Sequence, residues 1–144
     1  MLVNYTNGRF NVGQPKDWLL ICIYLVMAYD EYLADRTRRI FKDLGAMTIE
    51  KKMMGGLVFM VDDKMCVGLD KDKKSAEDRL MARIGPEVYE AALKEKGSRK
   101  MDFTGKPMKG FVYIYSDGID TDEDLEYWLV KALEFNRFAK KSKK

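Results

Sequence analysis

The sequence predicts one α+β domain of two layers, an antiparallel sheet of five to six strands with flanking helices in the order α-ββββ-α-ββ-α. Three observations lead to this fold class. Apolar residues recur at helical spacing after residue 29 and again after residue 121. The segments between these stretches are short alternating or apolar runs, which are typical of strands. Connections of hairpin length separate the runs, and short connections favour antiparallel pairing.

The first helix is expected over residues 29–44, and Gly45 stands where a helix commonly ends. Asp30 and Glu31 place negative charge in its first turn, which the helix dipole favours. The helix also carries three arginines among four acids. We expect these arginines to form ion pairs within the helix on a solvated face, and we favour this interpretation over a phosphate-binding patch. The arginines are Arg36, Arg38 and Arg39.

The strands are expected over 47–50, 57–61, 64–69, 80–84, 99–103 and 108–115. Two adjacent glycines, Gly55 and Gly56, mark the corner between the first two strands, where they can adopt φ > 0 or admit a close backbone approach. The charged segment 70–78 is predicted to be a long hairpin loop, solvated and mobile. Residues 80–84 also fit a helix, but Arg83 alternates with apolar neighbours, which favours a strand.

Two further helices complete the order of elements. One is expected to begin at Pro86, because proline suits the first helical position, and to end at Gly97. The other is expected to follow Thr121, whose hydroxyl can cap the helix and whose next residues are acidic. Its apolar stripe extends to Phe135.

The chain is divided into an extension over residues 1–26, one domain over 27–138 and a basic tail over 139–144. The extension is interpreted as lying upstream of a natural start at Met27. Residues 18–27 are ten consecutive apolar residues, about half of the ~20 that a membrane-spanning helix needs. A secretory signal is the weaker interpretation, because the usual small-residue cleavage pattern is missing. We therefore expect a cytoplasmic protein without membrane association.

The positive charge lies at the C-terminus and not on the body of the domain. The net charge is +3, of which residues 137–144 carry +5, residues 1–26 carry +1 and residues 27–136 carry −3. Domains that bind duplex DNA usually concentrate cations on a folded face. Weak, salt-dependent contact of the tail with nucleic acid is therefore the most that this distribution predicts.

The side chains offer little for catalysis or metal binding. The chain has no histidine, which removes histidine-based acid–base chemistry and the common zinc sites. The two cysteines, Cys22 and Cys66, have no ligand spacing and are expected to be reduced packing residues. The acids at 122–124 are adjacent and are better explained as favourable charge at a helix N-terminus than as an acid–base pair. We expect no catalytic residues, no metal and no cofactor.

The glycine corner and scattered cations are the candidate binding residues. The corner lacks a GxGxxG or P-loop pattern and does not open a helix, so a structural role is favoured over a phosphate site. The candidates for a small-molecule or phosphate site are Lys52, Gly55, Gly56, Arg83, Arg99 and Lys106. The further candidates for ligand or nucleic-acid contact are Lys109, Lys140, Lys141, Lys143 and Lys144.

From about Met27 to Lys144 the sequence resembles the TfoX N-terminal domain family, also called TfoX/Sxy-like. The resemblance rests on Lys52-Met53-Met54-Gly55-Gly56-Leu57, Lys64-Met65, Leu80-Met81-Ala82-Arg83, Arg99-Lys100-Met101, Gly105-Lys106-Pro107-Met108-Lys109-Gly110 and a terminal helix with Leu125 and Trp128. The chain departs from the family at Met54, where an aromatic is usual, at Lys106, where arginine is frequent, and in its longer 70–78 segment. Residues 1–26 have no counterpart in the family.

The resemblance implies an α+β regulatory domain. The namesake proteins regulate natural competence in bacteria, acting with the cyclic-AMP receptor protein at promoters, and carry a second, C-terminal domain that this sequence does not include. The resemblance brings no catalytic motif, so the expected function is a non-enzymatic regulatory or binding domain. The alternatives are a homodimeric protein-binding adaptor and a domain that binds a small molecule or phosphate. The expected partner is a protein or a second copy of the chain.

Overall fold

The computed structural model describes residues 28–102 and 105–140. The elements are α2 (Glu31–Asp43), β1 (Ile49–Met53), β2 (Gly56–Val61), β3 (Lys64–Lys71), β4 (Asp78–Arg83), α3 (Tyr89–Ala92), β5 (Ser98–Lys100), β6 (Phe111–Tyr115), the 3-10 turn η1 (Ser116–Gly118) and α4 (Asp122–Asn136). The strands form one antiparallel sheet in the order β1-β2-β3-β4-β6-β5. The predicted fold class is therefore confirmed, and residues 80–84 belong to a strand rather than a helix.

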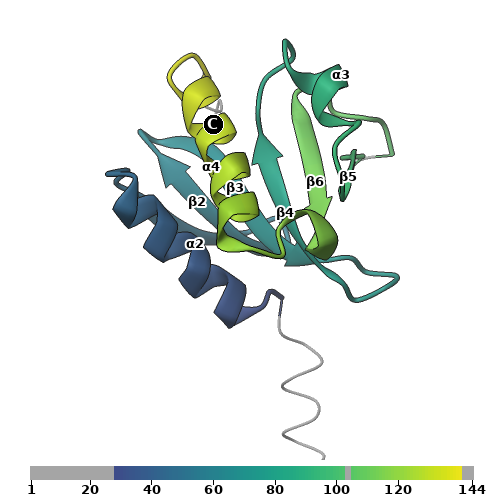
Figure 1. Cartoon of the computed structure of the whole chain (residues 1–144), viewed down its shortest axis with the longest axis horizontal. Coiled ribbons are helices and arrows are strands. Elements are labelled where there is room, and N and C mark those ends of the chain that lie inside the picture. The colour runs from purple at the N-terminus through teal and green to yellow at the C-terminus, as the bar shows by residue number, and fades with distance from the viewer. Residues whose placement is uncertain (1–27, 103–104, 141–144) are drawn as a thin grey trace, which may run out of the picture.

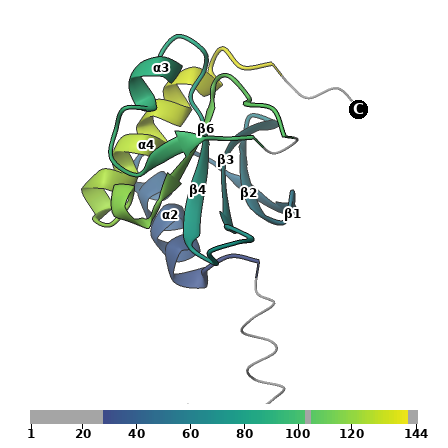
Figure 2. The same cartoon turned by 90° about the vertical axis from the view of Figure 1, so that its right-hand side faces the viewer.

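The helices cover one face of the sheet, which we call the inner face, and leave the outer face to the strands and the β5–β6 connection (Figures 1 and 2). Alternate residues of β4 divide between the two faces. Leu80 and Ala82 are fully buried in the main core together with Leu125 and Leu129 of α4. On the outer face, Met81 belongs to a separate cluster of methionines and tyrosines. The sheet thus has an ordinary apolar core on one side and a different surface on the other.

The glycine corner uses both properties that were expected of it. Met54 and Gly55 have φ of 56° and 76°, so two consecutive residues are left-handed, as in the turns that join hairpin strands. Gly56 has no such φ, but a Cβ there would lie 2.0 Å from the carbonyl oxygen of Leu69. Gly55 therefore serves the turn, and Gly56 serves the contact of β2 with β3.

Several element boundaries differ from the prediction. Strand β1 is Ile49–Met53 and not 47–50, β5 ends at Lys100 and not at residue 103, and α3 and β6 also differ. The helix expected from Pro86 to Gly97 is only Tyr89–Ala92. After it, the N–H groups of Lys94 and Glu95 bond carbonyls three residues back, which tightens the chain into turns. Strand β6 begins at Phe111 and not at residue 108. Just before Phe111, Gly110 has φ of 96°, and its carbonyl accepts hydrogen bonds from the N–H groups of Ile84 and Gly85. These features end the pairing of β6 with β4.

The expectation of ion pairs within the first helix is wrong for Arg36, and Arg39 also pairs with Asp122 of α4, at 3.9 Å. The side chain of Arg36 is 11% exposed, and its Nε donates to Oδ1 of Asp122 at 2.9 Å. Its Nη2 donates to the carbonyl of Ile119 at 3.0 Å. Arg36 thus links α2 to the start of α4. Arg38 does pair within the helix, with Asp35 and Glu31, and also with Glu50 of β1.

Candidate functional site

Two arginines and two tyrosines interleave on the outer face where β4, β6 and β5 meet. Tyr113 and Tyr115 are two residues apart on β6, so both side chains point to the same face. In the register of the sheet, Arg79 of β4 lies opposite Tyr115, and Arg99 of β5 lies opposite Tyr113. Each guanidinium stacks on the diagonal ring instead, with Arg79 3.7 Å from the centre of Tyr113 and Arg99 4.0 Å from that of Tyr115.

Arg79 is fully engaged with protein groups. Its Nε and Nη2 donate to the two carboxylate oxygens of Asp70 at 2.8 and 3.1 Å. Its Nη1 donates to the hydroxyl of Tyr115 at 3.0 Å. Burial alone would lower the pKa of Arg79, but the hydrogen bonds to Asp70 and Tyr115 raise it above the ordinary value. Arg79 is therefore a fixed part of the framework and has little capacity left for a ligand.

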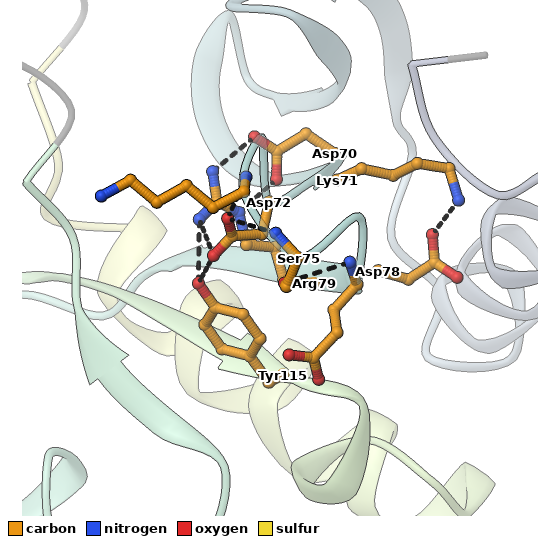
Figure 3. A network of polar contacts seen from close by, with 9 residues as sticks. Asp70, Lys71, Asp72, Ser75, Asp78, Arg79 and Tyr115 are labelled. Atoms are coloured by element: carbon orange, nitrogen blue, oxygen red, sulfur yellow. Dashed lines mark hydrogen bonds and ion pairs between the residues drawn. The ribbon is translucent and has the colours of Figure 1, made fainter. Parts of the chain in front are cut away.

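Asp72 fastens the β3–β4 loop to the sheet, as Figure 3 shows. Its carboxylate accepts from the hydroxyl of Tyr115 at 2.5 Å and from the backbone N–H groups of Lys74 and Ser75 at 2.8 and 3.3 Å. These bonds, the one from Tyr115 above all, lower the pKa of Asp72 to about 2.

The structure therefore corrects the predicted loop 70–78. Asp70, Lys71 and Asp78 belong to strands β3 and β4, and only the residues between the strands form the connection. That connection is held by Asp72 on the sheet side and by the backbone bond from the N–H of Asp72 to the carbonyl of Glu77 at 2.9 Å. The loop is solvated, as predicted, but it is tied to β6.

A hollow of about 750 Å³ opens between this loop, strand β5 and the β1–β2 turn. We call it the cationic hollow. Its walls include Lys73 and Lys74 from the loop and Arg99 and Lys100 from β5. Met54 lines it on the side of the β1–β2 turn, and the stacked tyrosines of β6 also line it.

Two of the acids that line the hollow are bonded to protein groups, whereas four of its cations form no ion pair within the described part of the chain. Asp70 and Asp72 are bonded as described above, and Lys71 pairs with Asp78 at 2.7 Å. The remaining four cationic side chains of the walls are exposed and form no ion pair with any described residue. They are Lys73, Lys74, Arg99 and Lys100. One exposed acid, Asp102, partly offsets them. The hollow therefore has a surplus of positive charge, which favours anions.

The structure brings together only part of the predicted site. Gly55 and Arg99 line the cationic hollow. Lys52 and Gly56 line a neighbouring hollow of about 480 Å³ beside Tyr29 of the N-terminal segment.

The remaining candidates lie elsewhere. Arg83 is also on the outer face, but its guanidinium lies 5.5 Å from the ring centre of Phe111 and donates to the carbonyl of Lys140. Burial lowers the pKa of Arg83. Lys106 and Lys109 are exposed on the β5–β6 connection and line neither hollow. The predicted tail contacts Lys141, Lys143 and Lys144 lie outside the described residues.

Sequence reasoning missed most of the residues that form the hollow. The sequence places Lys73 and Lys74 only in a solvated loop, and Lys100, Tyr113 and Tyr115 only in strands. The alternation of charged with apolar residues in β4, and of the tyrosines in β6, was the available signal. This alternation could not show the site, because the stacking of the arginines on the tyrosines depends on which strands are neighbours in the sheet.

Other features of the described residues bear on the predicted chemistry. Cys66 is buried in the core, and burial raises the pKa of its thiol to about 12, in agreement with a packing role. Cys22 lies outside the described residues. Within residues 28–102 and 105–140, no three or more acids and cysteines gather as metal ligands would. No helix in this part of the chain has the length and apolar character to cross a bilayer.

The fold and the hollow define a two-layer α+β domain with a ligand-sized cationic depression on the uncovered face of its sheet. The sequence pattern of the TfoX N-terminal domain matches residues 39–136. The chain belongs to the TfoX N-terminal domain family, as its motifs indicated. The match extends from within α2 to the end of α4 and so includes every strand that forms the hollow. Compared with curated proteins, the chain has no match.

Proposed function

We propose that this protein is a non-enzymatic binding domain that holds an anionic ligand in the cationic hollow and serves a regulatory role. The observation that carries the proposal is the imbalance of charge at the hollow. Two of its acids are bound by Arg79, Tyr115 and backbone N–H groups, whereas four exposed cations around a cavity of about 750 Å³ have no ionic partner among the described residues. An incoming anion supplies the missing partner.

The chemistry of the hollow supports binding in preference to catalysis. A general base works best with a pKa near the operating pH. The pKa of Asp72 is held at about 2, and Asp70 is engaged by Arg79. The one described thiol, Cys66, is buried on the other side of the sheet with a pKa of about 12. These groups are therefore suited to fixing the walls of a binding site.

The test is a titration with inorganic phosphate, pyrophosphate and tripolyphosphate, followed by calorimetry and by thermal unfolding. A ligand that binds the folded protein raises the unfolding midpoint by mass action. The double variant Arg99→Gln/Lys100→Gln removes two charges from the hollow. The matched control Lys106→Gln/Lys109→Gln removes two exposed charges outside it.

Weaker binding in the first variant alone is the expected result, with affinity that falls as salt increases. Equal loss in both variants would show that net charge, and not the hollow, attracts the anion. Absence of binding to all three anions would refute the proposal.

Membership of the TfoX N-terminal domain family supports a regulatory process, and we propose transcriptional control linked to DNA uptake in a bacterial cytoplasm. Deletion of the gene followed by measurement of transformation frequency and competence transcripts tests this directly. Unchanged transcripts would contradict it. Direct contact of the basic tail with DNA is tested separately, by binding across a salt series with and without residues 137–144.

We also propose that the partner is a second copy of the chain. A groove of about 520 Å³ lies between the β4–α3 connection and the end of α4, where the side chain of Phe138 is 76% exposed. A two-fold interface must be self-complementary, and this groove offers both Lys131 and Glu134 beside its apolar residues. Sedimentation of the full chain and of Phe138→Ser tests the proposal. A monomer in both cases would exclude it.

A further inference from the structure

We infer that the ligand of the cationic hollow is an organic polyphosphate of the nucleoside di- or triphosphate class. The inference rests on the proposed function, since it names the kind of anion that the hollow binds. It depends on the size of the hollow, on the distribution of its spare cations and on the apolar surface beside them.

The size of the hollow fits a small molecule. Its volume of about 750 Å³ lies within the range of roughly 300–1,000 Å³ that is typical of small-molecule sites. A single inorganic phosphate would fill only a small part of this space. The hollow is also recessed between the fixed β3–β4 loop and β5, whereas protein partners usually bind over broad surfaces.

The spare cations come from two separate elements, so they can neutralise a ligand that carries several charges. Lys73 and Lys74 are on the loop, and Arg99 and Lys100 are on β5. The loop keeps its position because Asp72 is bonded to Tyr115. A chain of two or three phosphates can contact the cations of both elements at once. A monophosphate is shorter and carries less charge, so it contacts fewer of them.

Arg99 is held in a geometry suited to phosphate. Its guanidinium stacks 4.0 Å from the ring centre of Tyr115, and this contact restricts its orientation. Among the described residues no acid pairs with it. Its donors therefore remain available, and a guanidinium fork binds two phosphate oxygens at once. Arg79, which stacks on the neighbouring ring, lacks this freedom because Asp70 occupies it.

The organic part of the ligand has a surface to contact. Met54 lines the hollow and packs against the outer-face cluster that includes Met81, Met101 and Tyr113. The space among these side chains themselves is only about 20 Å³, so a ring would lie over Met54 and not between the methionines. Methionine is flexible and polarisable and makes favourable contacts with aromatic rings. An inorganic polyphosphate would leave this surface unused.

The experiment is calorimetric titration of the full chain with ATP, GTP, AMP, adenosine and inorganic tripolyphosphate, in the presence of a chelator so that each ligand keeps its full charge. We expect ATP or GTP to bind about tenfold more tightly than tripolyphosphate and than AMP, and adenosine to bind most weakly. The variants Arg99→Gln and Lys73→Gln/Lys74→Gln should each weaken triphosphate binding about tenfold or more, because each removes charge-assisted hydrogen bonds. The control Lys106→Gln/Lys109→Gln should bind as the parent does.

The variant Met54→Ser separates the two parts of the ligand. It should weaken nucleotide binding while leaving tripolyphosphate binding unchanged, and the second measurement also shows that the variant has kept the hollow intact. Equal affinity of tripolyphosphate and the nucleotides would overturn the inference and leave the proposed function standing. Binding of AMP as tight as that of ATP would also overturn it. A 5′-phosphorylated oligonucleotide that binds more tightly than any nucleotide would assign the hollow to nucleic acid instead. Failure of every anion to bind would remove both the inference and the proposed function.

Discussion

Replacement of Tyr115 by phenylalanine removes one hydroxyl from the centre of the polar network and leaves the ring that supports Arg99. The hydroxyl donates to Asp72 at 2.5 Å and accepts from Arg79 at 3.0 Å. Hydrogen bonds to charged groups contribute about 1.5–3 kcal/mol when buried. Here the Asp72 and Arg79 side chains are 21% and 14% exposed, so we expect a loss of about 1–2 kcal/mol in the free energy of unfolding.

The same variant should change the dependence of stability on pH. The pKa of Asp72 is about 2 in the folded protein, below its value of ~3.9 in an unfolded chain. The stability that its carboxylate contributes is therefore complete above about pH 4 and is lost as the pH falls through about 2. Because Tyr115 is the largest cause of the lowered pKa, the difference in stability between the parent and Tyr115→Phe should shrink between pH 7 and pH 2.5.

Urea unfolding at a series of pH values measures both effects. Tyr113→Phe is the matched control, since Tyr113 lies on the same face of β6 and its hydroxyl makes no hydrogen bond to any described residue. At pH 7 the control should retain the stability of the parent to within ~0.5 kcal/mol. A Tyr115→Phe variant as stable as the parent at pH 7, or a loss that is equally large at pH 2.5, would refute the reasoning about the network.

Three further predictions concern the framework. Arg36→Met should lower the free energy of unfolding by about 2–3 kcal/mol, because the carbonyl of Ile119 and the carboxylate of Asp122 lose their buried donor. Arg39 is exposed and lies 3.9 Å from Asp122, so Arg39→Met should change the free energy of unfolding by less than ~0.5 kcal/mol in the same urea assay. Gly56→Ala should prevent normal pairing of β2 with β3, because its Cβ would meet a backbone oxygen at 2.0 Å. Gly55→Ala should cost only about 1–2 kcal/mol, because the new side chain would sit on a left-handed backbone. Circular dichroism and thermal unfolding distinguish the two variants, and equal effects would contradict the different roles of the two glycines. Leu129→Ala in the core should cost about 2–5 kcal/mol, and a loss below 1 kcal/mol would contradict the burial of α4 against the sheet.

The fold could be predicted because its signals are local. The alternation in 80–84 identified β4, and the cap at Thr121, which accepts from the N–H of Asp124 at 3.1 Å, identified the start of α4. The helix predicted from Pro86 begins later and is shorter in the structure, because tertiary contacts decide the conformation of a segment with weak local preference. Met54 and Gly55 form the turn together, which the sequence indicated only for the glycines.

The site could be predicted only in part because it depends on neighbours that are distant in sequence. Arg99 was singled out as a cation, but its stacking on Tyr115 requires β5 to pair with β6. Arg36 resembled its neighbours on the helix, and only the packing of α2 beside α4 shows that it is buried. The acids Asp70 and Asp72 made the segment look solvated, whereas their bonds to β4 and β6 leave the nearby lysines in surplus. Charge counting along the chain cannot reveal which charges are already paired.

The central claim is that the unpaired cations of the hollow bind an anion. Nuclear magnetic resonance of the ¹⁵N-labelled full chain, titrated with tripolyphosphate, tests it residue by residue. The backbone amide signals of Lys73, Lys74, Arg99 and Lys100 should shift together and saturate with one affinity. Shifts confined to the C-terminal lysines, or no saturable shifts at all, would contradict it.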